Sequence, residues 1–309
     1  MRATAQEVGK SGMPPKGYLL FPLFDVSFAR QYTACAMLRF PNAKINIGLF
    51  VTEKRQDGYH NLETIFYPVM LRDALEIIPN IAAPGDDMDF HSFGLPIPGD
   101  TKSNLVTKAY RLLKNDFGAT MASAGAWLYK HIPMGGGMGG GSADGAFALG
   151  MLNELFALGL EEYQLLQYAL QLGSDCPFFI HNKPMYGSGR GEVLEAATID
   201  LSGYDVLLIC PNIHVSTAEA FGGIKPKPAP YDLRELHKLP VAEWHNVVRN
   251  DFEETVFQKH PELYAIKEKL YAKGAIYAAM SGTGATVYSI FEKGKAAAAK
   301  ELGHDFFIV

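Results

Sequence analysis

Cysteine is scarce in this chain. Three of the 309 residues are cysteines, Cys35, Cys176 and Cys210, and none belongs to a CxxC pair or to a Cys/His cluster with the spacing of zinc ligands. An odd number of widely spaced cysteines does not make a disulfide framework and is typical of a reducing compartment. We therefore expect a cytoplasmic protein.

Long hydrophobic runs are missing as well. No apolar stretch reaches the roughly 18 residues that span a bilayer, and the N-terminus lacks the basic-then-apolar order of a secretory signal. We expect no membrane association. Residues 1–36 mix Gly, Pro and aromatic residues without periodicity. We interpret them as an upstream extension or a misassigned start that is not native; the alternative is an N-terminal arm. The measured mass of the natural protein would distinguish the two, since a start near Met37 would exclude the arm.

The chain also lacks an excess of positive charge. The chain has 28 Lys and Arg against 33 Asp and Glu, a formal net charge of −5. Nothing in the composition therefore indicates a basic surface for nucleic acid, and a site for an anion must be built from local groups. The 48% hydrophobic and 20% charged fractions are those of an ordinary globular protein of one large or two medium domains.

What is present is a mixture of strand and helix patterns. Between residues 40 and 51 aliphatic residues alternate with Lys44, Asn46 and Gly48. The period of two predicts a half-buried strand with Lys44 and Asn46 side by side on the face opposite the isoleucines.

The remaining elements are predicted from the same periodicities. We predict further strands at residues 65–79, 124–133, 175–180, 204–211, 275–280 and 285–291. We predict helices at residues 101–118, from the N-cap Ser142 to 155, 160–172, 261–274 and 292–303. Residues 222–230, GGIKPKPAP, are the clearest loop or lobe junction. The mixture predicts an α+β protein with two lobes.

Residues 135–141, GGGMGGG, place six glycines in seven positions between a predicted strand and a predicted helix. Glycine loses more backbone freedom on folding than any other residue, so the run indicates a ligand that must approach bare backbone. Consecutive N–H groups ahead of a helix N-terminus, which carries about half a positive charge, form a phosphate cradle. A flexible linker is the alternative, but Pro133 before the run and the patterned helix after it argue against one.

The residues after the glycine run limit which known phosphate-binding motif the run can be. A Walker loop requires GK[ST], and no lysine stands at that position; a GxGxxG match inside six glycines carries little information. Positive charge for a nucleotide must then come from elsewhere, with Lys44 and Lys130 as candidates. The alternative for each lysine is an ordinary solvated side chain.

Six segments together resemble a known family. They are FPNAKINIGL, DGYHNLET, KHIPMGGGMGGGSADGA, LGSDCPFFI, GRGEVLE and MSGTGATV. Their order and approximate spacing resemble the GHMP superfamily of small-molecule kinases, within it the isoprenoid-biosynthesis branch, from about residue 37 to the C-terminus. Ala143-Asp144 stands where many members carry Ser-Asn. The resemblance implies a ribosomal-protein S5 domain-2-like lobe at residues 37–199, a ferredoxin-like lobe at residues 200–309, and a substrate cleft between them.

The resemblance also implies the reaction. It is the ATP-dependent phosphorylation of the 2-hydroxyl of a cytidine-diphosphate-linked methylerythritol, on the non-mevalonate route to isopentenyl diphosphate. The catalytic pair falls on Lys44 and Asp175. Without the resemblance, an Asp between a predicted helix and a predicted strand is more often a local cap. An Asp with a reference pKa of about 3.9 beside a lysine is a weak base. Because phosphoryl transfer has a loose transition state, we expect Asp175 to orient the hydroxyl and accept its proton late, while Lys44 and Mg²⁺ stabilise the charge.

The resemblance places ATP on the glycine loop. The expected ATP-binding residues are Asn104, Lys130, Pro133, Gly135, Gly136, Gly137, Gly139, Gly140, Gly141 and Ser142. Asp144 or Ser142 could hold Mg²⁺. Asp144 would repel a bare phosphate, so either a magnesium ion lies between them or the carboxylate points away; the sequence leaves this open.

The acceptor residues are expected in DGYH and nearby. Tyr59 would stack on the pyrimidine, His60 would hydrogen-bond it and Phe221 would close its other face, with Asn46 and Phe66 completing the shell. Stacking accepts any base, so the choice of cytosine must come from hydrogen bonds around His60. A turn residue and a surface histidine are the alternatives for Tyr59 and His60.

Two other functions remain open. One is a GHMP kinase for mevalonate, homoserine or a sugar, although those kinases lack DGYH followed by LET after the first strand. The other is a nucleotide-binding or regulatory protein without catalysis, which the presence of both Lys44 and Asp175 argues against. We expect a monomer or homodimer that binds no nucleic acid.

Overall fold

The computed structural model describes residues 36–79, 88–297, 299 and 305–308. These residues belong to one compact unit, residues 35–309. The predicted extension, apart from Ala36, lies outside the described residues. Within the described part of the chain, no helix combines the length and the apolar character that crossing a bilayer requires.

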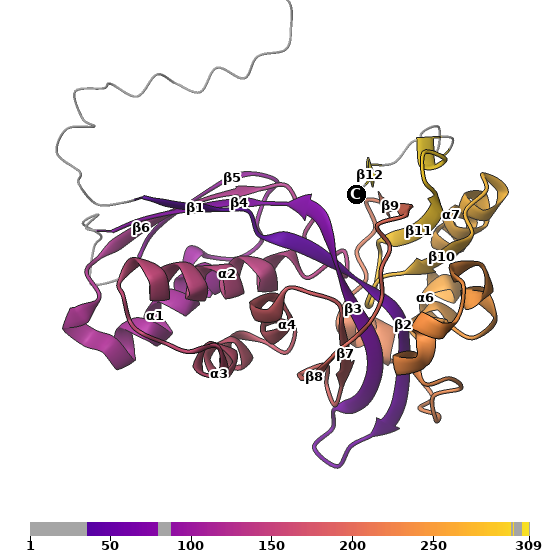
Figure 1. Ribbon diagram of the computed structural model, residues 1–309, viewed down its shortest axis with the longest axis horizontal. Coiled ribbons are helices and arrows are strands. Elements are labelled where there is room, and N and C mark those ends of the chain that lie inside the picture. The colour runs from indigo at the N-terminus through magenta and orange to yellow at the C-terminus, as the bar shows by residue number, and fades with distance from the viewer. Residues whose placement is uncertain (1–35, 80–87, 298, 300–304, 309) are drawn as a thin grey trace, which may run out of the picture. The chain divides into compact units, whose positions relative to one another are not determined.

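The N-terminal lobe contains a sheet covered by helices. Its strand order is β1 (Met37–Arg39), β4 (Ala74–Pro79), β6 (Ala124–Lys130) and β5 (Asp89–Gly94), with β5 parallel to β6 and the other pairs antiparallel. Four helices lie on one side of it (Figure 1): α1 (Leu105–Phe117), α2 (Gly140–Leu155), α3 (Glu162–Leu172) and α4 (Cys176–His181). The sheet and helices enclose one apolar core, in which α2 packs against α1, α3 and α4.

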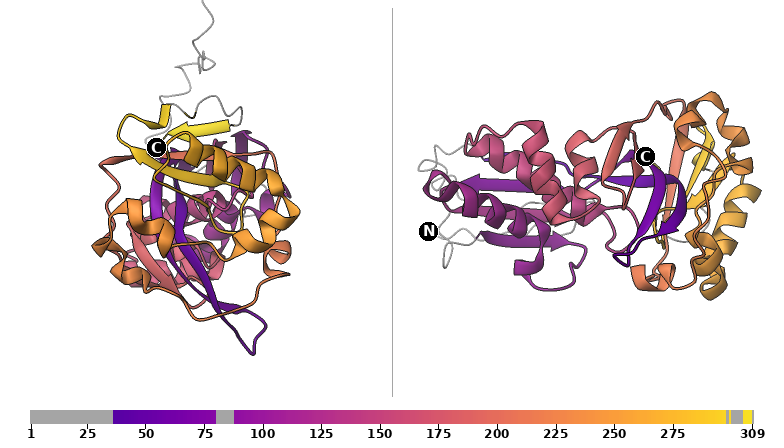
Figure 2. Two further views of the ribbon diagram at one scale, coloured as in Figure 1. Left: turned by 90° about the vertical axis from the view of Figure 1, so that its right-hand side faces the viewer. Right: turned by 90° about the horizontal axis from the view of Figure 1, so that it is seen from below.

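A long hairpin connects this layer to the rest of the molecule. It consists of β2 (Asn42–Lys54) and β3 (His60–Arg72), in a sheet of order β2-β3-β7-β8 with β7 (Met185–Ser188) and β8 (Val193–Ala196). Figure 2 shows the hairpin between the helical layer and the C-terminal sheet. Its isoleucines Ile45 and Ile47 share a second core with Tyr277 and Ile290 of the C-terminal lobe, so the hairpin belongs to the packing of both lobes.

The C-terminal lobe is an antiparallel sheet with helices on one face. The strand order is β10 (Tyr277–Met280), β11 (Val287–Glu292), β9 (Tyr204–Cys210) and β12 (Asp305–Ile308). This places the strands in the order second, third, first, fourth, as in a ferredoxin-like fold. The lobe also contains α5 (Thr217–Phe221), α6 (Phe252–Lys259) and α7 (Pro261–Ala272). Among the 3-10 turns, η3 (Thr101–Ser103) and η4 (Gly118–Thr120) flank α1 in the N-terminal lobe, and η5 (Leu233–Lys238) and η6 (Val241–Asn246) lie in the C-terminal lobe. The prediction of a two-lobed α+β fold is confirmed.

Several local predictions are wrong for identifiable reasons. The strand predicted at residues 175–180 is instead helix α4, which begins at Cys176 after the N-cap residue Asp175, and Pro177 in its first turn favours helix. Helix α2 begins at Gly140 with Gly139 as N-cap, φ +70°, so Ser142 is not the cap. Residues 65–79 form two strands of different sheets, broken at Asp73.

Two further predictions need correction. Strand β2 is buried on both faces from residue 42 to residue 51, not half-buried, because its polar face packs under the glycine loop. Of the helix predicted at residues 292–303, the described residues form the end of β11, a turn and 3-10 structure, and residues 298 and 300–303 lie outside the described part.

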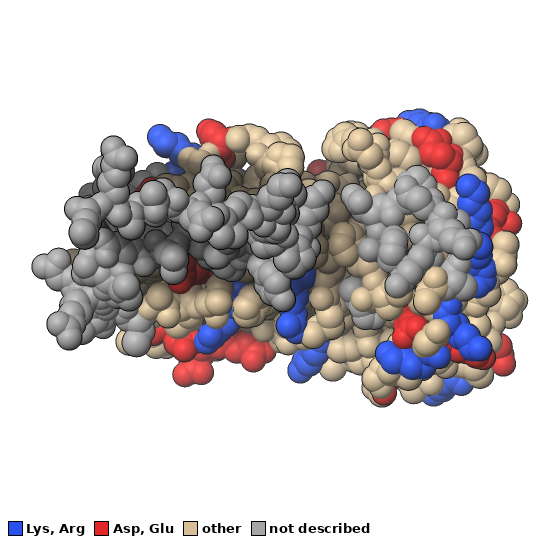
Figure 3. Space-filling view, turned by 90° about the horizontal axis from the view of Figure 1, so that it is seen from above, with Lys and Arg blue, Asp and Glu red and all other residues tan. Residues whose placement is uncertain are grey.

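The charge distribution is mixed, in keeping with the net charge. On the face shown in Figure 3, acidic and basic side chains are interspersed over the C-terminal lobe.

Candidate active site

The glycine loop holds its carbonyl groups inward. The oxygens of Gly136, Gly137, Met138 and Gly139 accept hydrogen bonds from Thr286 N (3.3 Å), Ser281 Oγ (2.9 Å), Lys44 N (3.0 Å) and Ala143 N (2.9 Å). The C=O and N–H of a trans peptide point in opposite directions, so the N–H groups of residues 137–140 point away from these partners. In the described part of the chain these four amides donate no hydrogen bond to protein. They are therefore available to an anion.

Two loops approach each other at Gly137. A Cβ built on Gly137 would lie 2.1 Å from the Ser281 carbonyl oxygen, and its φ is +74°. Asn250 holds the second loop: its Nδ2 donates to the carbonyls of Met280 (2.8 Å) and Gly282 (2.7 Å). Glycine is required here because no side chain fits between the loops.

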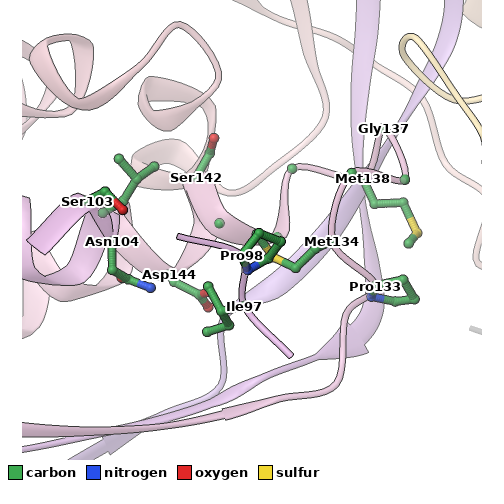
Figure 4. Close-up of a pocket in the computed structure, with 16 residues that line it drawn as sticks. Ile97, Pro98, Ser103, Asn104, Pro133, Met134, Gly137, Met138, Ser142 and Asp144 are labelled. Carbon is green, nitrogen blue, oxygen red and sulfur yellow. The ribbon is translucent and has the colours of Figure 1, made fainter. Parts of the chain in front are cut away.

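A cavity of about 290 Å³ opens over the glycine loop (Figure 4). It brings together Asn104, Pro133, all six glycines and Ser142, nine of the ten residues that the sequence assigned to ATP. Asn104 caps helix α1 by accepting a hydrogen bond from Val106 N (2.8 Å), which fixes its side chain at the rim. Asp144 also lines this cavity.

Lys130, the tenth residue, lies beneath the loop and does not line this cavity. Its buried ammonium donates to Asp73 and to Asp144 Oδ2 (2.9 Å). Asp73 in turn accepts from the amides of His131 (2.6 Å) and Ile132 (2.8 Å). Lys130 thus ties the start of α2 to the end of β6.

Asp144 has one oxygen without a partner. Its Oδ1 is buried and accepts no hydrogen bond within the described residues, while Oδ2 is bound to Lys130. Burial, together with the nearby carboxylate of Asp73, raises the pKa of Asp144 well above its ordinary value. A buried acceptor of this kind at a phosphate site fits a hard cation such as Mg²⁺, which uses few protein oxygens and keeps phosphate and water ligands. The described residues contain no group of three or more His, Cys, Asp or Glu that could hold a metal ion.

Lys44 and Asp175 are brought together as expected. Lys44 is 3% exposed, and its Nζ lies 2.6 Å from Asn46 Oδ1 and 3.4 Å from Asp175 Oδ2. The same ammonium lies 5.2 Å from the centre of the Phe66 ring. Asp175 stands at the N-cap position of α4 but makes no capping hydrogen bond, and its side chain is 36% exposed. The alternative of a local cap is therefore wrong, and the carboxylate is free for a ligand.

A second cavity of about 560 Å³ contains this ion pair. It is lined by every residue that the sequence assigned to catalysis or to the acceptor: Lys44, Asn46, Tyr59, His60, Phe66, Asp175 and Phe221. Gly137 and Gly139 line both cavities, whereas Lys130 lines neither. The two cavities therefore meet at the glycine loop, beside the ion pair.

The aromatic residues occupy one part of the second cavity. His60 stacks on Phe221, with ring centres 4.9 Å apart and planes at 27°. Partial burial, with a smaller contribution from Lys54, lowers the pKa of His60. Tyr59 is 57% exposed, which leaves ring surface for a ligand.

Sequence reasoning missed several residues of the site. Asp73 and Asn250 position the glycine loop and its neighbour from distant parts of the chain, and no local pattern identifies them. Ser281 lies in MSGTGATV and Arg190 in GRGEVLE, two segments that carried the family resemblance without a role for these side chains.

Comparisons with known proteins agree with this geometry. A model described as the GHMP kinases N terminal domain matches residues 104–183, and one described as GHMP kinases C terminal matches residues 232–305. The class that the fold and the glycine-loop site define is therefore that of the GHMP kinases.

Similar proteins identify the family within this class. The chain is 51% identical over 258 residues to a 4-diphosphocytidyl-2-C-methyl-D-erythritol kinase of Bacteroides thetaiotaomicron, covering 83% of this chain and 92% of the relative. It is 38% identical over 265 residues to one of Chlorobium phaeobacteroides, covering 81% and 87%. A crystal structure of 4-(cytidine 5'-diphospho)-2C-methyl-D-erythritol kinase matches with TM-score 0.73 and 27% identity, over 88% of this chain and 98% of that one. The chain belongs to the 4-diphosphocytidyl-2-C-methyl-D-erythritol kinase family.

Proposed function

We propose that this protein transfers the γ-phosphoryl group of ATP to the 2-hydroxyl of 4-diphosphocytidyl-2-C-methyl-D-erythritol, a step of the non-mevalonate route to isopentenyl diphosphate. One observation carries the proposal beyond family membership. Two cavities meet at Gly137 and Gly139, and the Lys44–Asp175 pair lies on the second of them. A phosphate donor in one and an alcohol in the other would meet at the bare amides.

The first cavity receives ATP in this proposal. The free amides of residues 137–140 bind phosphate oxygens, and the N-terminus of α2 adds its partial positive charge. Asn104 lies at the adenosine end. Lys130 contributes from below by holding Asp144 and the start of the helix in place.

The residues at this position fit Mg²⁺. Asp144 Oδ1 and the Ser142 hydroxyl are the protein oxygens that would hold it. When bound, the ion neutralises charge on the phosphates. With the ion in place, the Asp144 carboxylate would lie next to a cation and not next to a bare phosphate, so the two negative groups would not repel each other.

Lys44 and Asp175 act on the acceptor. The Asp175 carboxylate accepts a hydrogen bond from the 2-hydroxyl and orients it toward the phosphorus. Lys44 is held by Asn46 on one side and Asp175 on the other, so its charge is fixed where the transferring group becomes negative. In a loose transition state the hydroxyl loses its proton late, and a carboxylate is then a sufficient base.

The aromatic part of the second cavity receives the cytosine. Tyr59 offers a free ring face, and the stacked pair His60–Phe221 forms another aromatic surface of the same cavity. Because its pKa is lowered, His60 is neutral near pH 7 and offers one donor and one acceptor. That pair of groups selects a base by hydrogen bonding, which stacking alone does not do.

Other expectations from the sequence stay predictions. They are the lobe boundary between residues 199 and 200, the cytoplasmic location, the absence of nucleic-acid binding and the monomeric or homodimeric state.

Acceptor-dependent ATP consumption tests the proposed function. We expect ADP formation with 4-diphosphocytidyl-2-C-methyl-D-erythritol and none above background with mevalonate, with homoserine or without an acceptor. Turnover with mevalonate or homoserine alone would identify another kinase of the class. ATP binding without turnover on any acceptor would identify a non-catalytic protein.

A further inference from the structure

Arg190 enters the second cavity from a rigid hairpin. It lies between β7 and β8, flanked by Gly189 and Gly191 with φ of +68° and +104°. The Gly189 carbonyl accepts a hydrogen bond from Leu62 N (2.7 Å), which fixes the turn to strand β3. Arg190 itself lines the cavity. The turn thus presents a fixed guanidinium to whatever occupies this space.

The orientation of this guanidinium leaves its end free. Its Nε donates to Glu192 Oε1 (3.2 Å), and its central carbon lies 5.0 Å from the centre of the Tyr59 ring. Within the described residues, neither Nη group donates a hydrogen bond to protein. Glu192 and Tyr59 therefore hold the plane of the guanidinium while its two terminal nitrogens remain available.

Arg190 keeps two donor groups free for a ligand, because Glu192 pairs its Nε while its Nη groups make no hydrogen bond to the described protein. The basic side chains that line the second cavity are Lys44, His60 and Arg190, and the one acidic side chain among the described lining residues is Asp175. Lys44 is engaged by Asp175 and Asn46, and His60 is neutral near pH 7 because its pKa is lowered. Planar guanidinium groups pair with phosphate oxygens through two parallel hydrogen bonds.

We propose that the Nη groups of Arg190 bind the diphosphate of the acceptor, between the cytosine on Tyr59 and the alcohol at Asp175. This inference rests on the proposed function, since it takes a cytidine diphosphate moiety as the occupant. It gives Arg190 a role in specificity, because an acceptor without a diphosphate offers no phosphate oxygens to its two Nη groups.

Calorimetric titration of the full chain with cytidine and with cytidine diphosphate tests the inference without catalysis. In the wild type we expect the diphosphate to tighten binding. Arg190→Gln should weaken the binding of cytidine diphosphate about 10- to 100-fold, the range for losing charge-assisted hydrogen bonds, and change the binding of cytidine less than twofold. Arg234→Gln is the matched control: it removes the same charge, and Arg234 pairs with Asp232 (2.9 Å), lies over the Tyr186 ring and does not line the cavity. We expect it to change neither affinity.

Three results would overturn the inference. Equal weakening of cytidine and cytidine diphosphate in Arg190→Gln would mean that Arg190 only supports Tyr59. Unchanged affinity of Arg190→Gln for cytidine diphosphate would mean that the Nη groups of Arg190 do not reach the phosphates. Equal affinities of the wild type for cytidine and cytidine diphosphate would mean that no group of the protein, Arg190 included, binds the diphosphate favourably.

The failure of this inference is distinguishable from failure of the proposed function. Acceptor-dependent ATP consumption by the wild type, together with any of these three results, leaves the kinase assignment intact and removes only the role of Arg190. A wild type that binds no cytidine ligand and consumes ATP with another alcohol overturns both.

Discussion

The chemistry at the scale of single residues depends on one ion pair. Lys44 is buried and bound on two sides, whereas Asp175 is partly exposed and makes no capping hydrogen bond to α4. A lysine fixed in this way supplies charge, and a carboxylate with free oxygen surface supplies orientation. The two residues therefore have separate roles and separate tests.

Replacing Asp175 tests its role directly. We expect Asp175→Ala to lower turnover by roughly 10²-fold or more, as loss of a positioned proton acceptor does. The dissociation constant for ATP should stay nearly unchanged, because Asp175 lines the acceptor cavity and not the ATP cavity. Steady-state kinetics and ATP titration measure the two quantities, and Asp175→Asn controls for side-chain volume. Turnover like that of the wild type would remove Asp175 from the mechanism.

Residue-scale prediction from the sequence succeeded where neighbours in the chain decide the outcome. Strand alternation placed Lys44 and Asn46 on one face, and the structure joins them by a hydrogen bond of 2.6 Å. It could not show that Lys130 is enclosed by Asp73 and Asp144, because Asp73 is 57 residues away along the chain. A lysine ahead of a glycine loop looks the same in the sequence whether it faces phosphate or a buried carboxylate.

At the scale of elements, the decisive feature is the contact between the glycine loop and the loop after β10. Gly137 has a positive φ and a carbonyl 2.1 Å from where its Cβ would be. Each loop therefore fixes the other, and the amides of the cradle depend on both.

Two glycine-to-alanine substitutions, one in the glycine loop and one in α2, separate this contact from ordinary helix preference. Gly137→Ala forces the loops apart, so we expect ATP binding to weaken about tenfold or more by titration. Gly150→Ala lies within α2 with open space around it. Because alanine is preferred to glycine in helices by up to about 1 kcal/mol, it should raise the free energy of unfolding slightly and leave ATP binding unchanged. Unaltered ATP affinity in Gly137→Ala would contradict the cradle.

Element type was predictable from long periodic segments and not from short ones. Helix α3 ends at Leu172 with Gly173 as its C-cap, as its pattern predicted. The six residues of α4 form too short an apolar run to distinguish helix from strand. Pro177 in the first turn and the packing of Phe178 and Phe179 into the core of the N-terminal lobe together favour the helix.

At the scale of the whole described unit, the lobes share a core. Strand β2 contributes Ile45 and Ile47 to the same apolar cluster as Tyr277 and Ile290. Separating the lobes would expose apolar surface on both. We therefore infer that the unit 35–309 unfolds as one body.

The two tryptophans allow this to be measured, since Trp127 lies in β6 of the N-terminal lobe and Trp244 in η6 of the C-terminal lobe. We expect Trp127→Phe and Trp244→Phe, each followed by the fluorescence of the remaining tryptophan, to give a single urea transition that coincides with the loss of circular dichroism in the same variant. A fluorescence transition separated from the circular-dichroism transition would show that the lobes unfold independently.

The central claim is that bare amides and one ion pair bring a triphosphate and an alcohol together. A crystal structure with a non-hydrolysable ATP analogue and 4-diphosphocytidyl-2-C-methyl-D-erythritol tests it most directly. We expect phosphate oxygens on the amides of residues 137–140 and the 2-hydroxyl within hydrogen-bond distance of Asp175, on the Lys44 side. A triphosphate bound away from the glycine loop, or a 2-hydroxyl remote from Asp175, would contradict it.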